Sequence, residues 1–136
     1  MAQERCLFLL SKNMKQNKII IVDDDPSILE VLTLVLEESD YEVIALDSGE
    51  KVREIVNRDK PDLMLLDLWI PGVNGPQILT QLKNDSTTKN VPIILISAAT
   101  EIKETAEQYH ADAYLPKPFN IDELESTITQ FLPKAL

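Results

Sequence analysis

The residues of this sequence that could do chemistry are carboxylates, a hydroxyl and an amine, and each closely follows a short apolar run. They are Asp23, Asp24, Asp25, Asp67, Ser97 and Lys117. If the apolar runs are parallel strands of one sheet, their carboxyl ends lie at one edge, which is where such sheets bind ligands. The sequence therefore predicts that these side chains converge on a single polar site.

The aspartates indicate a magnesium site. Several carboxylates crowded at one edge raise one another's pKa unless a cation neutralises them, and hard oxygen ligands favour Mg²⁺ over zinc or copper. An aspartate in such a site can attack phosphorus to form an acyl phosphate, while the metal and Lys117 screen charge on the transferred oxygens. Ser97 could donate a hydrogen bond to the same group. We therefore expect Asp67 to accept a phosphoryl group.

Five apolar runs, rich in β-branched residues, must position this site. They cover residues 18–22, 41–46, 63–66, 93–96 and 113–115, and they alternate with segments of helical periodicity that begin near Pro26, Ser48, Pro76, Ile102 and Asn120. This alternation predicts parallel strands joined by crossover helices, an α/β fold. Ser48 and Asn120 are expected to be N-caps, with Glu123 completing a capping box after Asn120, and Asp25 is expected to cap rather than bind metal.

Size and charge restrict the function. A chain of 136 residues suits one domain, which we place at residues 18–136 after an N-terminal extension, 1–17. The formal net charge of −10 predicts no direct binding of nucleic acid, and the apolar runs are too short to insert into a membrane. The apolar cluster at residues 6–10 lacks the cleavage site of a secretory signal. A single cysteine, Cys6, excludes an internal disulfide and fits the cytoplasm.

Four segments together resemble the receiver domains of two-component response regulators. They are Ile19–Pro26 (IIIVDDDP), Leu65–Gly75 (LLDLWIPGVNG), Leu95–Ala98 (LISA) and Tyr114–Phe119 (YLPKPF). The resemblance covers nearly everything from Lys18 to Leu132. It implies a doubly wound, five-stranded parallel sheet of flavodoxin-like order 2-1-3-4-5 with (βα)5 connectivity, in a domain similar to the stand-alone chemotaxis regulators.

The resemblance also implies a role for each site residue. Asp67 would take a phosphoryl group from a sensor histidine kinase or a histidine phosphotransfer protein and become an aspartyl phosphate. Asp24, Asp67 and the main-chain carbonyl of Trp69 would ligate Mg²⁺, and Asp23 would do so mainly through water. Lys117 and Ser97 would hold the phosphoryl oxygens.

A signalling switch would follow from this reaction. Tyr114 would rotate as Ser97 moves toward the phosphoryl group. The output would pass to an unknown protein target through the face of the fourth helix, fifth strand and fifth helix. The domain would catalyse only its own phosphorylation and dephosphorylation, and a homodimer is left open.

Three positions depart from the family's usual residues. Trp69, two residues after Asp67, is bulkier than usual, and we hypothesise that it shields the acyl phosphate from water or anchors a partner. His110 occupies a helix-ending position where glycine is common, which predicts local strain or a polar cap there. Ile70 replaces a frequent methionine conservatively. At Lys117–Pro118 the sequence alone favours a trans peptide bond, whereas the resemblance implies cis.

The same residues admit other interpretations. The aspartate run could be a solvated turn with a helix cap, Ser97 and Tyr114 could serve local packing, and Lys117 could be an ordinary surface charge. A haloacid-dehalogenase enzyme would need an acidic residue where Trp69 stands, and a flavin-binding domain would not place acidic residues beside the flavin phosphate. A receiver-like adaptor that binds partners without phosphorylation is the remaining alternative.

Overall fold

The computed structural model describes residues 16–133 as a parallel sheet covered by helices on both faces. The predicted extension therefore falls almost wholly outside the described residues, as do the apolar cluster and Cys6. The strands are β1 (Lys18–Val22), β2 (Glu42–Leu46), β3 (Leu63–Asp67), β4 (Ile93–Ser97) and β5 (Ala113–Pro116), in the order β2-β1-β3-β4-β5. The predicted α/β class and the order 2-1-3-4-5 are both confirmed.

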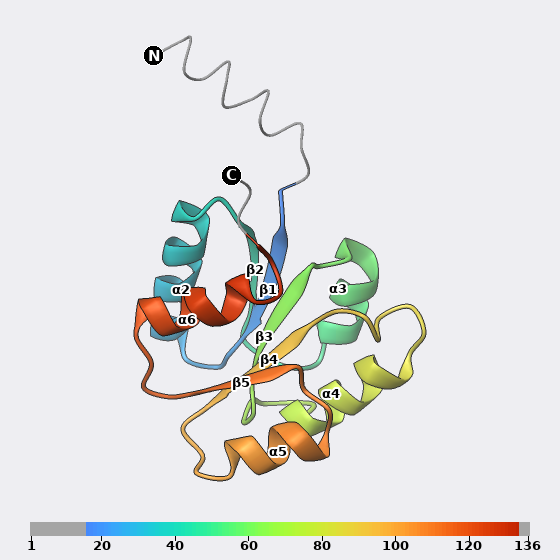
Figure 1. Cartoon of the computed structure of the whole chain (residues 1–136). Helices are drawn as coiled ribbons and strands as arrows, with labels where there is room; N and C mark the ends of the chain where they lie inside the picture. The colour runs from blue at the N-terminus through green and yellow to red at the C-terminus, as the bar shows by residue number, and fades with distance from the viewer. Residues whose placement is uncertain (1–15, 134–136) are drawn as a thin grey trace, which may run out of the picture.

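The helices divide unequally between the two faces of the sheet. They are α2 (Pro26–Glu38), α3 (Val52–Asp59), α4 (Gly75–Asn84), α5 (Ile102–Gln108) and α6 (Ile121–Thr129). Buried side chains of α2 and α6 pack in one apolar cluster, and those of α3, α4 and α5 pack in another on the opposite face (Figure 1). The sheet is therefore the middle layer of three.

Side chains that alternate along the central strands produce the two apolar clusters. In β3, for example, Leu63 and Leu65 join the cluster under α2 and α6, while Met64 and Leu66 join the other. All four side chains are fully buried. A central strand covered on both faces needs this continuous apolar run, because successive side chains point to opposite faces.

Local sequence explains most of the helix starts. Asp25 accepts a hydrogen bond from the Ser27 N–H ahead of α2, as predicted, and Asn120 accepts one from the Glu123 N–H ahead of α6. Asn74, directly before α4, accepts one from the Gln77 N–H. These caps fix where the chain leaves the edge of the sheet that carries the predicted site.

The prediction that Ser48 caps the second helix is wrong. Helix α3 begins at Val52, and its N-cap is Lys51, whose side chain makes no capping hydrogen bond. The turn before α3 is held by another loop, because the Gly49 N–H donates a hydrogen bond to the Pro71 carbonyl at 3.0 Å. Ser48 therefore lies in the turn between β2 and α3, before the helix begins. The same hydrogen bond connects this turn to the segment after Asp67.

Three further expectations concern single positions in the chain. His110, after α5, has a φ of +63°, the left-handed region that favours glycine, so the strain predicted there is confirmed. The Lys117–Pro118 peptide bond is cis, as the family resemblance implied. Tyr41, which was predicted to open the second strand, instead lies just before β2 and is buried.

The strand register brings the predicted site residues to one level. Val22 of β1 lies beside Leu66 of β3, so Asp23 and Asp67 each follow at the same edge. Ser97 of β4 pairs with Pro116 of β5, the residue before Lys117. The carboxyl ends of four strands thus present these side chains together.

Candidate functional site

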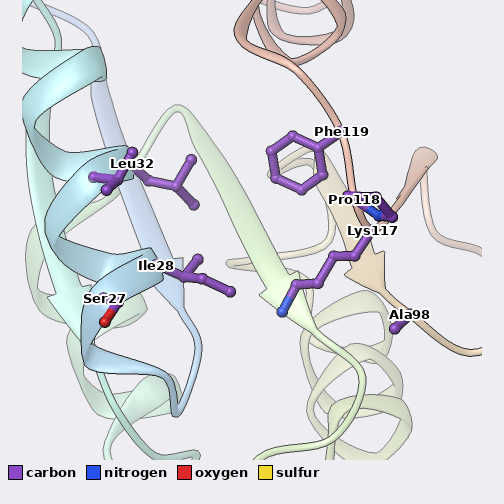
Figure 2. A pocket seen from close by; sticks show the side chains of 8 residues that line it. Ser27, Ile28, Leu32, Ala98, Lys117, Pro118 and Phe119 are labelled. Atoms are coloured by element: carbon purple, nitrogen blue, oxygen red, sulfur yellow. The ribbon is translucent and has the colours of Figure 1, made fainter.

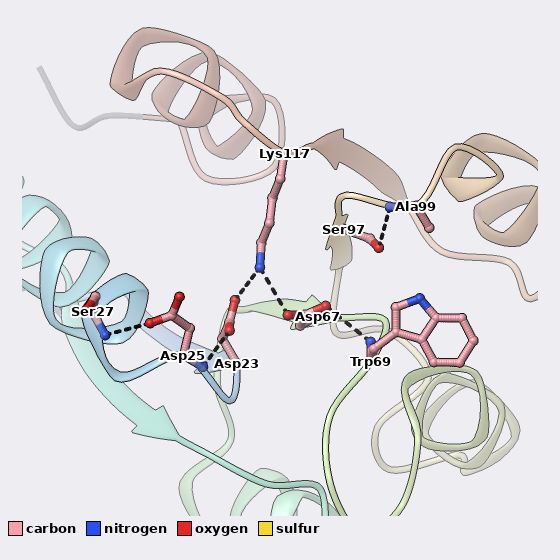
Figure 3. A network of polar contacts seen from close by, with 8 residues as sticks. All are labelled: Asp23, Asp25, Ser27, Asp67, Trp69, Ser97, Ala99 and Lys117. Carbon is pink, nitrogen blue, oxygen red and sulfur yellow. Dashed lines mark hydrogen bonds and ion pairs between the residues drawn. The ribbon is translucent and has the colours of Figure 1, made fainter.

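Asp23 and Asp67 are the buried carboxylates of the site, and one ammonium group joins them. Lys117 Nζ lies 2.8 Å from Asp23 Oδ2 and 3.0 Å from Asp67 Oδ2 (Figure 3). The Asp23 side chain is fully buried, and that of Asp67 is nearly so. Two carboxylates this close in a buried place repel each other, so the shared ammonium is what makes their proximity tolerable.

The remaining carboxylate oxygens are held by backbone N–H groups. Asp23 Oδ1 accepts from the Asp25 N–H at 2.9 Å, and Asp67 Oδ1 accepts from the Trp69 N–H at 3.1 Å. Each bond spans two residues in a turn that leaves the strand end. The turns therefore fix the direction of both carboxylates before any ligand arrives.

Lys117 reaches the site because its own backbone is anchored to the neighbouring strand. Its N–H donates to the Ser97 carbonyl at 2.8 Å, and the cis bond to Pro118 follows directly. The side chain then extends from the end of β5 toward β1 and β3 (Figure 3). The reading of Lys117 as an ordinary surface charge is therefore wrong.

Asp24 completes a set of three carboxylates that suits a hard cation. Asp23, Asp24 and Asp67 each offer an oxygen, and these oxygens lie within 4.8 Å of one another. Asp24 is exposed, so the set opens to solvent on one side, through which a hydrated cation can enter. Oxygen-only ligands that leave room for water are the chemistry that Mg²⁺ requires, and these residues fit it.

Burial and pairing set the protonation of the central groups. Burial raises the pKa of the Asp67 carboxyl, and the hydrogen bonds from Lys117 and the Trp69 N–H only partly oppose that rise. Burial alone would lower the pKa of Lys117, but its bonds to Asp23 and Asp67 outweigh that effect and raise it. Lys117 therefore remains an ammonium, and a cation beside Asp67 would stabilise the ionised carboxylate.

Of the predicted switch residues, Ser97 ends β4 at the same sheet edge as Asp67 but its hydroxyl contacts local backbone, and Tyr114 lies on β5. Ser97 is buried at the end of β4, and its Oγ accepts from the Ala99 N–H at 3.0 Å (Figure 3). Tyr114 is 38% exposed on β5. Ser97 thus makes the local backbone contact that was the structural alternative, and the switch motion stays a prediction.

Trp69 lies beside Asp67, but its ring does not cover the Asp67 carboxylate. The side chain is 62% exposed, and the indole extends away from the Asp67 carboxylate in Figure 3. Only its backbone N–H bonds to Asp67. This orientation favours the partner-anchor interpretation over the water shield.

The site's geometry and its order along the chain match one known family. Residues 19–129 match the family model described as the response regulator receiver domain. The chain belongs to this family. Receiver domains are phosphorylation-dependent switches of two-component systems, which accept a phosphoryl group on an aspartate and work with histidine kinases or phosphotransfer proteins.

Relatives and solved structures agree with the family match. The chain is 33% identical to sporulation initiation phosphotransferase F of Bacillus subtilis, over 88% of this chain and 97% of that protein. A putative response regulator from Chloroflexus aurantiacus has the same fold, with a TM-score of 0.82 and 31% identity over 88% of this chain and all of that one.

A third comparison bears on the metal. The receiver domain of the sensor histidine kinase PA1611 from Pseudomonas aeruginosa, solved with a magnesium ion in its active site cleft, gives a TM-score of 0.80. Its identity is 24%, over 88% of this chain and 99% of that one, so this likeness shows the fold alone.

The present chain spans only about half the length of the curated DNA-binding regulators it matches. Within residues 16–133, no helix is both long and apolar enough to cross a membrane.

Sequence reasoning missed an apolar hollow beside Lys117. It measures about 480 Å³ and lies between α2 and the segment after β5; it is lined by Ser27, Ile28, Val31, Leu32, Ala98, Lys117, Pro118 and Phe119. Figure 2 shows Ile28 and Leu32 facing Pro118 and Phe119 across it. The sequence offers only an indirect hint of it: Val31 is apolar although it lies outside the core stripe of α2, and the structure shows it 55% exposed at the hollow.

Proposed function

We propose that Asp67 is the phosphoacceptor of this receiver domain. A carboxylate oxygen of Asp67 attacks the phosphorus of a phosphohistidine on the donor protein. The phosphorus–nitrogen bond breaks, its electron pair stays on the imidazole nitrogen, and Asp67 becomes an acyl phosphate. The observation that carries the proposal is the pairing of Lys117 Nζ with Asp67 at 3.0 Å, because it places a positive charge where the transferred oxygens arrive.

The reaction is assisted by Mg²⁺ held at the three carboxylates. Asp24, Asp67 and the Trp69 carbonyl would hold the ion directly, and Asp23 would contribute mainly through water. When bound, the ion screens the negative charge of the incoming phosphoryl group. Support comes from the convergence of the three carboxylate oxygens within 4.8 Å.

Lys117 and Ser97 hold the phosphoryl group once it is in place. Lys117 exchanges part of its contact with Asp67 and Asp23 for the new oxygens, and Ser97 turns its hydroxyl from the Ala99 N–H toward them. Tyr114, now exposed on β5, rotates as Ser97 moves. The change is displayed on the face of α5, β5 and α6 to a downstream protein.

The donor is a sensor histidine kinase or a histidine phosphotransfer protein that contacts the apolar hollow. A phosphohistidine on a protein must approach Asp67 together with the residues around it, and the hollow beside Lys117 can receive apolar side chains from that protein.

The domain acts in the cytoplasm, in keeping with its lone cysteine. It is a regulator rather than an enzyme for a separate substrate, since it catalyses only its own phosphorylation and dephosphorylation.

The test is to offer acetyl phosphate with Mg²⁺ and to measure the gain of one phosphoryl mass on the intact chain. The wild type should be labelled, and Asp67→Ala should not be. Asp25→Asn is the matched control, because Asp25 belongs to the same acidic run but caps α2, so this variant should be labelled like the wild type. Absence of label on the wild type, or equal labelling of Asp67→Ala, would overturn the proposal.

A further inference from the structure

Helix α4 differs from every other described helix in its charge. It is the one helix within residues 16–133 that contains no aspartate or glutamate, in a chain whose formal net charge is −10. Its single cation, Lys83, is already paired with Asp112 at 2.7 Å. Its outward residues, Gln77, Thr80 and Asn84, are exposed and uncharged. An uncharged helix face needs an explanation on so acidic a surface.

Two aromatic side chains border this helix and help to form a hollow. The hollow measures about 450 Å³ and is lined by Trp69, Asn74, Pro76, Gln77, Thr80, Gln81 and Tyr109. We call these seven residues the α4 face. Protein interfaces are enriched in tryptophan and tyrosine and depleted of charge at their centres, and exposed tryptophan is a frequent anchor. The α4 face has this composition.

The surface continues past the α4 face to a charged rim. Thr80 and Gln81 also line a second hollow of about 630 Å³, whose other residues include Arg53 and Asp85. The Arg53 guanidinium lies 3.9 Å from the Asp85 carboxylate, and the arginine is well exposed. The rim therefore offers one cation and one anion side by side.

These features fit a second copy of the same chain better than a charged partner. Asn74, Gln77 and Gln81 carry amides, each of which donates and accepts, so such a face can pair with a second copy of itself across a two-fold axis. Two chains of net charge −10 repel each other, and the other helices would bring acidic residues together. Across a two-fold axis, Arg53 and Asp85 of one copy can pair with those of the other.

We propose that the α4 face is a homotypic interface through which two copies of this receiver domain associate. The interface adjoins the acceptor, because the Trp69 N–H that donates to Asp67 Oδ1 belongs to the residue that anchors the face. It lies on the opposite side of the acceptor from the hollow between α2 and Phe119. Self-association and phosphoryl transfer from a donor therefore use different surfaces.

The test is sedimentation equilibrium of the full chain from micromolar to millimolar concentration. Thr80 is the position to change, since it is exposed, lies mid-helix and lines both hollows. The wild type should dimerise, and Thr80→Glu should raise the dimer dissociation constant about tenfold, because it places two like charges across the axis. Thr80→Lys should do the same, and a mixture of the two variants should associate more tightly than either alone.

A matched control separates local contact from total charge. Ser126→Glu adds the same charge at an exposed position on α6 and should leave the dissociation constant within about twofold of wild type. Trp69 is the only tryptophan in the chain, so its emission should also move to shorter wavelength as the wild type associates.

Three results would overturn the proposal. They are a wild type that stays monomeric to millimolar concentration, a dimer that neither Thr80 variant weakens, and a dimer that Ser126→Glu weakens equally. Labelling of Thr80→Glu by acetyl phosphate should match wild type, which keeps this outcome distinguishable from a failure of the phosphoacceptor itself.

Discussion

The two sides of Asp67 are packed very differently. On the side of α2, an open hollow of about 480 Å³ separates Ile28 and Leu32 from Phe119. On the side of α4, apart from the surface hollow lined by Trp69 and Tyr109, the loop after Asp67 is pressed against its neighbours. A Cβ atom added to Gly49 would lie 2.2 Å from the Val73 carbonyl oxygen, and one added to Gly75 would lie 2.8 Å from the Leu68 carbonyl oxygen.

This difference suits the two sides of Asp67, the proposed acceptor, to different tasks. The tight side holds the segment that carries the Trp69 carbonyl, a predicted metal ligand whose position must be accurate. The open side leaves space that an incoming protein can fill. A phosphoacceptor needs both, because positioning the reacting groups requires rigidity while admitting a large donor requires an unfilled surface.

The largest expected effect comes from filling space on the tight side. Gly49→Ala should lower the free energy of unfolding by roughly 3 kcal/mol, because the new methyl overlaps a backbone oxygen that cannot move alone. Urea denaturation measures it. Lys51→Ala, an exposed change in the same turn, should cost less than about 0.5 kcal/mol. A similar small cost for Gly49→Ala would show that this side is not rigid.

A smaller effect is expected from a charge on the open side. Val31→Asp should leave stability nearly unchanged, since Val31 is 55% exposed. It should slow phosphoryl transfer from a phosphohistidine transfer protein about tenfold, because a buried unpaired charge opposes docking. The transfer rate is measured with any such protein that labels the wild type.

Two controls accompany the Val31 experiment. Labelling of Val31→Asp by acetyl phosphate, a donor too small to need the hollow, should be unchanged. Thr80→Glu, on the other side of Asp67, should leave the protein-donor rate at the wild-type value. Equal loss with both donors would mean that Val31 acts on the chemistry and not on docking.

The smallest effect concerns Trp69 and the lifetime of the acyl phosphate. If the indole swings over Asp67 after phosphorylation, Trp69→Asn should speed phosphate release by about threefold, or roughly 0.6 kcal/mol in the barrier. The loss of phosphoryl mass with time measures this rate. An unchanged rate would agree with the outward indole seen here and leave Trp69 as an anchor only.

Sequence reasoning succeeded where local signals and burial agree. The apolar runs of β1, β3 and β4 predict buried strands of a parallel sheet, and the residues that follow such strands share one edge. The lysine between two prolines was likewise recognisable, and the structure shows its ammonium between Asp23 and Asp67. The positions of these side chains follow from the order of the strands and from the period of two along each strand.

Reasoning failed where contacts between distant loops decide. Ser48 has the composition of an N-cap, but the bond from Gly49 to Pro71 overrides that local preference. The hollow beside Lys117 depends on how far α2 stands from Phe119, which no local pattern encodes. The switch motion of Ser97 and Tyr114 stays a prediction, because it concerns a phosphorylated state and not local sequence.

The Lys117 ammonium, which lies between Asp23 and Asp67, has a consequence for the charge of the ion that this site would bind. Three carboxylates and one ammonium leave a formal charge of minus two within the cluster. A divalent cation cancels that charge, whereas a monovalent cation leaves half of it and a trivalent one reverses the sign. Because Lys117 stays protonated, the cluster is matched to an ionic valence before size or geometry is considered. The charges around Asp67 alone therefore favour a doubly charged ion.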